Sequence, residues 1–165
     1  RVLFRSASTP TASPEQTEPL PPAGEDYGDI AAADIEKAKQ TARSFVQAIE
    51  TYGPGTTVEQ ALEKATAFMH PAWADQMGGD DPIDDAEYSR MVEAGKTRTV
   101  DVQKLFVTSG SQKKHRVVMT VTLRTGWVPA STTMLPASQP AYRMVVELRA
   151  NDDAWGVSDY RPADA

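Results

Sequence analysis

The spacing of apolar residues predicts helices in the first half of the chain. Between residues 35 and 49 apolar side chains recur every three or four positions, which places them on one face of a helix. The Gly-Pro-Gly at 53–55 ends this segment, because proline cannot continue the helical hydrogen bonding. A second helix is predicted from Thr57, where Thr57-x-x-Gln60 has the form of a capping box. Two shorter helices are predicted at residues 72–77 and 84–94.

Alternation of apolar and polar residues then predicts strands from residue 98 onward. In the first strand, 98–108, the alternation changes phase at Gln103-Lys104, which indicates a β-bulge, and Ser-Gly-Ser-Gln at 109–112 indicates a turn. The inward row of the next two strands is Val117, Met119, Val121, Leu123, Tyr142, Met144, Val146 and Leu148, and a last strand carries Trp155 and Val157. Helices followed by four consecutive strands predict an α+β fold, with the N-terminal helices packed on a curved four-stranded antiparallel sheet.

Residues 1–33 have the composition of a linker, so we place the folded domain at residues 34–162. The chain opens with Arg-Val-Leu-Phe-Arg-Ser, which matches the translation of a sequencing adapter; a native stretch that ends a signal or membrane segment is the alternative. Five prolines lie within residues 7–33, and such a segment cannot bury enough apolar surface to order itself. We therefore expect a disordered proline-rich tether, with a frayed terminus as the alternative. The native N-terminus, with any signal peptide or membrane anchor, is expected to precede it.

Composition excludes several kinds of chemistry. The 165 residues include no cysteine, which excludes disulfides, thiolate metal sites, iron–sulfur clusters and a cysteine nucleophile. Two histidines, His70 and His115, argue against a multi-histidine metal site. No dinucleotide-binding or phosphate-loop motif occurs, and the acidic residues 80–85 lack the ligand spacing of an EF-hand. We predict no metal, no cofactor and no catalytic residue.

The inward strand positions offer no evident catalytic base, since none of them is Asp, Glu or His. His70 precedes a proline at the end of a helix, where a capping role is the ordinary interpretation. His115 lies at the exposed end of a hairpin. Tyr142 is expected to pack in the core and donate one hydrogen bond.

Charge is divided unevenly along the chain and identifies a candidate interaction surface. Residues 7–95 hold 5 basic and 17 acidic side chains, whereas residues 96–128 hold 7 basic and 1 acidic. The outward sheet face would combine arginines with apolar and threonine side chains, and a long loop from Trp127 to Pro140 would add a second surface. Strand propensity alone is the alternative explanation for the outward residues. The candidate residues are Arg116, Val118, Thr120, Arg124, Trp127, Arg143 and Val145.

The order of elements over residues 34–161 resembles the nuclear transport factor 2-like superfamily, whose fold is the cystatin-like roll. Two local features sharpen this resemblance: the helical runs at 41–46 and 67–73, and the closing segment Asp-Ala-Trp-Gly-Val at 153–157 followed by Tyr-Arg-Pro at 160–162. Both look like the extracytoplasmic domains of actinobacterial and other Gram-positive envelope proteins. Those include conjugation components related to type IV secretion assembly factors, and proteins associated with lipid import.

The resemblance implies a non-catalytic scaffold or assembly domain of a membrane-anchored envelope transport or conjugation component. Such a domain would be extracytoplasmic or secreted, and it would contact protein partners or a second copy of itself. The membrane would be reached through the missing N-terminal anchor alone. Nucleic-acid binding is not predicted, because the net charge is -6 and no motif interleaves aromatics with cations. The alternative function is a small-molecule-binding or isomerase/cyclase-like enzyme that uses the cone between sheet and helices.

Overall fold

The computed structural model describes residues 23–77, 85–149 and 153–164. Its helices are α1 (Ala32–Ile49), α2 (Val58–Thr66), α3 (Pro71–Met77) and α4 (Asp85–Glu93). Its strands are β2 (Lys96–Ser111), β3 (Arg116–Pro129), β4 (Ala141–Leu148) and β5 (Trp155–Pro162). The proposed adapter-derived residues and most of the predicted linker lie outside the described residues.

The helices begin close to the residues that the sequence predicts, and they bury the predicted faces. The apolar stripe of α1 is buried along its whole length. At α2 the Thr57 hydroxyl accepts from the Gln60 amide, and the Gln60 side chain accepts from the Thr57 amide, so the predicted capping box is confirmed. No helix in the described ranges has both the length and the apolar character that a membrane span requires.

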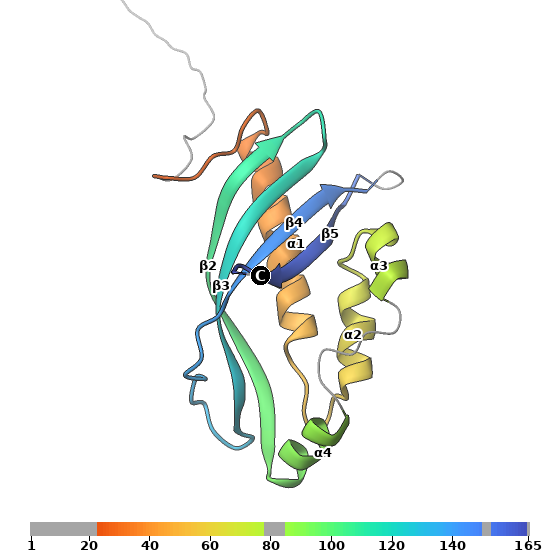
Figure 1. The fold of residues 1–165 in the computed structure, drawn as a ribbon, viewed down its shortest axis with the longest axis vertical. Coiled ribbons are helices and arrows are strands. Elements are labelled where there is room, and N and C mark those ends of the chain that lie inside the picture. Colours follow the sequence, from red (N-terminus) through yellow and green to blue (C-terminus); the bar gives the residue numbers. More distant parts are fainter. Residues whose placement is uncertain (1–22, 78–84, 150–152, 165) are drawn as a thin grey trace, which may run out of the picture.

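The sheet has the order β2-β3-β4-β5, and every neighbouring pair is antiparallel. α1 runs along one face of the sheet, and the helices that the structure describes leave the opposite face uncovered (Figure 1). The predicted α+β class, with helices packed on a four-stranded antiparallel sheet, is therefore confirmed. β2 and β3 extend past β4 and β5 as a two-stranded ribbon that reaches α4 (Figure 1).

Two apolar clusters form the interior. The main core joins α1 to the inward rows of the four strands, and Val117, Met119, Val121 and Leu123 are fully buried as predicted. A smaller cluster lies under the ribbon and includes Tyr52, Val58 and Ala61.

Packed structure begins before residue 34. The Asp26 amide donates to the Val107 carbonyl, and the Glu25 carboxylate accepts from the Val107 amide, so this segment lies along the free edge of β2. The prediction of a turn at 109–112 is wrong, because β2 continues through Ser111 and the chain turns at 112–115. Gly110 serves a different purpose there, because a Cβ at this position would collide with the Tyr27 carbonyl oxygen.

Candidate functional site

The uncovered sheet face brings together five of the residues predicted to form an interaction surface. Register places Thr120 opposite Arg143, Val118 opposite Val145 and Arg116 opposite Glu147. Because side chains alternate across a strand, these residues of β3 and β4 share the face turned away from α1.

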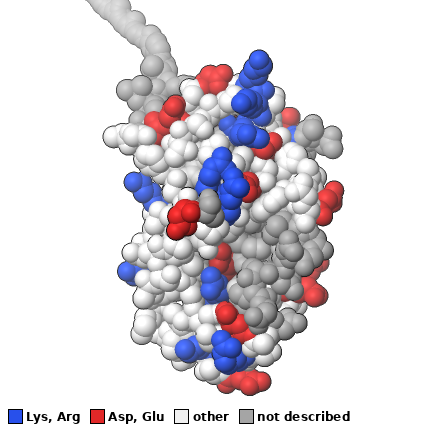
Figure 2. All heavy atoms as spheres, in the orientation of Figure 1, with Lys and Arg blue, Asp and Glu red and all other residues white. Residues whose placement is uncertain are grey.

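The arginines of this face are paired with carboxylates. Arg116 lies 3.3 Å from Glu147, Arg143 lies 3.1 Å from Asp159, and Arg161 lies 3.2 Å from the same Asp159 oxygen. Positive and negative side chains are correspondingly mixed over the middle of the face in Figure 2. These pairs are about half exposed on the arginine side, so each is worth about 0.2–1 kcal/mol. They organise the face more than they stabilise the fold.

Val145 does not belong to the open part of this surface. Its exposed fraction is 5 %, and the register places it between Val118 of β3 and Asp159 of β5. The expectation that Val145 offers open apolar area is wrong, and replacing it by Asp would disturb packing rather than a free surface.

Trp127 also departs from the predicted surface. Its ring meets Tyr52 edge-on, with the centroids 5.6 Å apart, and its indole N–H donates to Glu87 over 3.4 Å. It therefore packs against the smaller cluster under the ribbon, on the helix side of the sheet. Trp127 and the loop that follows it are therefore separate features, because Trp127 lies on the helix side of the sheet and the loop does not.

Arg124 lies on the outer face but apart from the paired arginines. It stands opposite Asp101 of β2, beyond the last residue of β3 that pairs with β4. Its Nε atom is buried and has no hydrogen-bond partner among the described residues. Arg149, just after β4, donates to the Ala67 carbonyl at the end of α2.

The interior contains a polar cluster that the sequence analysis missed. Glu50, at the end of α1, accepts from Arg98 of β2 at 2.8 Å and 3.3 Å through one oxygen. Its other oxygen accepts from the Tyr160 hydroxyl of β5 at 3.0 Å. Glu50 is 8 % exposed, so the interior holds a carboxylate that the inward strand positions do not reveal, because it comes from the end of a helix.

Two signals in the sequence point to this cluster. Glu50 follows Val46 by four residues and so continues the buried stripe of α1. Arg98 belongs to the alternating row of Val100 and Val102, which pack against the core.

Aromatic rings surround the cluster, and burial raises the pKa of its tyrosine hydroxyls. Tyr142 stacks on Tyr160 at 4.4 Å, and Phe45 meets Tyr160 edge-on at 5.2 Å. Burial, followed by the charge of Glu50, raises the pKa of Tyr160 and of Tyr142. Burial also raises the pKa of Tyr52 to about 12, against the opposing effect of Arg98.

The guanidinium of the cluster stays charged. Burial alone would lower the pKa of Arg98, but the charge and hydrogen bonds of Glu50 outweigh it and raise that pKa. The cluster therefore consists of the Glu50–Arg98 ion pair and the Tyr160 hydroxyl that donates to Glu50.

The remaining candidate groups have local roles or lie elsewhere. His70 Nδ1 accepts from the Ala72 amide over 3.4 Å, so its local role is at the start of α3 and not at the end of α2, which lies at Thr66. His115 has a φ of 51° in the β2–β3 turn. Residues 80–84 lie outside the described residues, and within the described part no group of three or more His, Asp or Glu side chains is placed to hold a metal ion.

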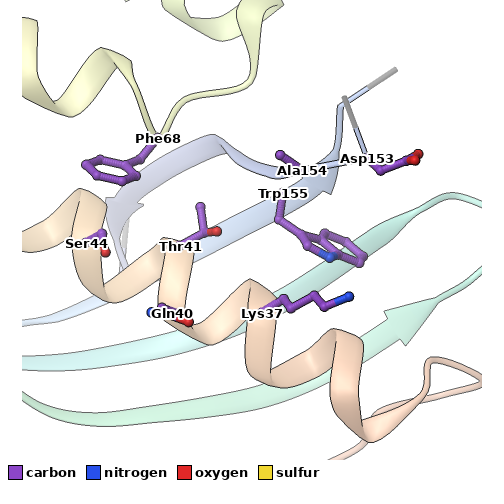
Figure 3. A pocket seen from close by; sticks show the side chains of 8 residues that line it. All are labelled: Lys37, Gln40, Thr41, Ser44, Phe68, Asp153, Ala154 and Trp155. Carbon is purple, nitrogen blue, oxygen red and sulfur yellow. The ribbon is translucent and has the colours of Figure 1, made fainter. Parts of the chain in front are cut away.

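A pocket of about 340 Å³ opens between α1 and the start of β5 (Figure 3). Lys37, Gln40, Thr41 and Ser44 of α1 line one side, and Phe68 and Trp155 contribute apolar surface. The lining is mostly neutral, and neither Glu50 nor Arg98, the ion pair of the interior, belongs to it.

No protein-family model matches the sequence, and no curated protein is significantly similar to it. Among solved structures, the chain is similar to VirB8 of Agrobacterium tumefaciens, with 13% identity and a TM-score of 0.48 over 81% of this chain and 94% of that one. It is also similar to a TraE protein in complex with 2-(2-furyl)isonicotinic acid, with 14% identity and a TM-score of 0.47 over 82% of this chain and 96% of that one.

Proposed function

We propose that the chain is a non-catalytic assembly domain of an envelope transport or conjugation machine, held outside the cytoplasm by an N-terminal membrane anchor. One observation carries the proposal: within the described residues, the polar cluster of Glu50, Arg98 and Tyr160 is satisfied internally, and the helices leave a broad, charge-patterned sheet face uncovered. Such a face suits contact with a protein partner or a second copy of the chain.

The state of Glu50 favours this role over the enzymatic alternative. A carboxylate that acts as a general base needs an oxygen within hydrogen-bond reach of the substrate. Both oxygens of Glu50 are taken, one by Arg98 and the other by Tyr160. The cluster thus ties the end of α1 to β2 and β5, which is a structural task.

The membrane tether and the location rest on the sequence. The proline-rich segment before the domain is suited to separating a folded unit from a membrane. The runs at 41–46, 67–73 and 153–157 resemble those of envelope proteins, as described above.

Site-specific photo-crosslinking in the native cells would test the assembly role. A photoreactive amino acid at Thr120 reports on the sheet face, and one at Glu63 on the exposed side of α2 is the matched control. We expect adducts from position 120, with an envelope protein or with a second copy, and none from position 63. Equal adducts at both positions, or none at 120, would contradict the proposal.

Cell fractionation separates the location from the assembly role. The full-length protein should sediment with membranes and be digested by protease added outside intact cells lacking their wall. Recovery in the soluble cytoplasmic fraction would refute the tethering.

A further inference from the structure

The outer sheet face leaves one of its arginines without a partner. Arg116, Arg143 and Arg161 each lie within 3.3 Å of a carboxylate oxygen. The side chain of Arg124 makes no ion pair or hydrogen bond within the described residues, and its Nε is buried. A desolvated donor without an acceptor is unfavourable. The Nη groups of Arg124 are not buried and have no acceptor among the described residues, so they are the donors that another molecule can reach.

The nearest acidic side chain does not meet this need. Asp101 faces Arg124 across the β2–β3 ladder, yet its carboxylate accepts from the side-chain amide of Gln103. Asp101 also keeps the local positive charge small. A phosphate group or an anionic lipid surface, which needs several cations, is therefore a poorer match than a single carboxylate.

A loop that exposes two large apolar side chains is held to β3 next to the position of this arginine. Met134 and Leu135 are 63 % and 49 % exposed, and they are the large apolar residues that the described surface exposes most. The loop that carries them is held to β3, because the Thr125 amide donates to the Ser138 carbonyl at 3.1 Å. Pro136 is buried against Gly126, two residues from Arg124, where a Cβ would lie 3.5 Å from the proline ring.

We propose that Arg124, Met134 and Leu135 form a docking surface for an acidic peptide segment of a partner protein. We call these three residues the Arg124 patch. A carboxylate of the partner accepts from the Arg124 guanidinium, and an apolar side chain next to it packs on Met134 and Leu135. This inference rests on the proposed assembly role and names the chemistry of its partner.

Selection from a random 12-residue peptide library displayed on phage tests the proposal with the whole chain as bait. The wild type should enrich peptides that place Asp or Glu next to Leu, Ile, Phe or Met. Arg124→Met should lose the acidic preference, and Met134→Ser with Leu135→Ser should lose the apolar one. For the best peptide, Arg124→Met should weaken binding about tenfold or more. Arg116→Met, at a paired arginine of the same face, is the matched control and should leave binding unchanged.

Several outcomes would overturn the proposal: no enrichment, enrichment without acidic residues, or equal losses in the Arg124 and Arg116 variants. Binding to phosphatidylglycerol vesicles that depends on Arg124 would also overturn it, in favour of a membrane surface. Thermal unfolding excludes a folding defect, since Arg124→Met removes an unsatisfied donor and should melt no lower than the wild type. If position 120 still forms adducts in cells while peptide binding ignores Arg124, this inference fails and the assembly role stands.

Discussion

The β2–β3 hairpin carries two arginines in opposite situations, one on each face of the sheet. Arg98 points inward, where its Nε and one Nη atom donate to Glu50 and its side chain is 17% exposed. Arg124 lies on the outer face, where its buried Nε has no acceptor among the described residues. The same side chain on the same hairpin is thus part of the fold in one place and unpartnered in the other.

The difference shows how the two faces divide their roles. The hydrogen-bonded ion pair of Glu50 and Arg98, together with Tyr160, holds the end of α1, β2 and β5 together. Removing either member of the pair leaves the other charge buried and uncompensated. An unpartnered guanidinium does not stabilise the free chain, and its unburied Nη donors are available to another molecule. The inner face therefore specifies the fold, and the outer face is suited to recognition.

Replacing Glu50 by Leu should produce the largest effect on the inner face. Arg98 would keep its charge in a buried position without its carboxylate, and Tyr160 would lose its acceptor. We expect a loss of about 3–5 kcal/mol in the free energy of unfolding, measured by urea denaturation.

A double variant makes this prediction specific to the pair. Glu50→Leu with Arg98→Met leaves no uncompensated charge, so it should recover much of the stability that Glu50→Leu alone loses. If the two substitutions simply add, the ion pair is not the source of the loss.

Alkaline pH offers a second way to probe the inner face, through Tyr52. Burial raises the pKa of Tyr52 from 10.0 to about 12, so between these values the unfolded chain releases a proton that the folded chain retains. The stability from this residue is present below pH 10 and lost as the pH rises toward 12. In that window the free energy of unfolding should fall by at most about 1.4 kcal/mol per pH unit from this group.

Tyr52→Phe isolates this contribution from that of other groups. The wild type and the variant should diverge in the slope of stability against pH above pH 10, with the wild type steeper. Arg124→Met, on the other face, should follow the wild type. Parallel curves for the wild type and Tyr52→Phe would show that the ring hydroxyl is not desolvated.

The sequence predicted the fold well because its elements bury apolar rows of clear period. The stripe of α1 and the alternating row from Val117 to Leu123 each have a single arrangement that buries them. The capping box at Thr57 is local, so it too is readable without neighbours.

The site was harder to predict because its features depend on contacts between distant segments. Glu50, Arg98 and Tyr160 meet only when the end of α1, β2 and β5 converge. In the sequence alone, a charged residue that continues an apolar stripe looks like the point where the buried stripe ends. Trp127 belongs to the inner row of β3. The sequence analysis placed it on one candidate surface with the loop that follows it. Val145 is buried between neighbouring strands on both sides, Val118 of β3 and Asp159 of β5, and alternation in one strand does not reveal which strands will flank it.

The smallest effect is expected on the outer face, from Arg116→Gln. Arg116 is 45% exposed and lies 3.3 Å from Glu147, so water screens the pair and the two side chains lose mobility by forming it. We expect a loss of about 0.2–1 kcal/mol in urea denaturation at low salt, shrinking further near 1 M NaCl. A loss approaching that of Glu50→Leu would mean that the paired arginines of the outer face support the fold as Arg98 does, and the division between the two faces would no longer hold.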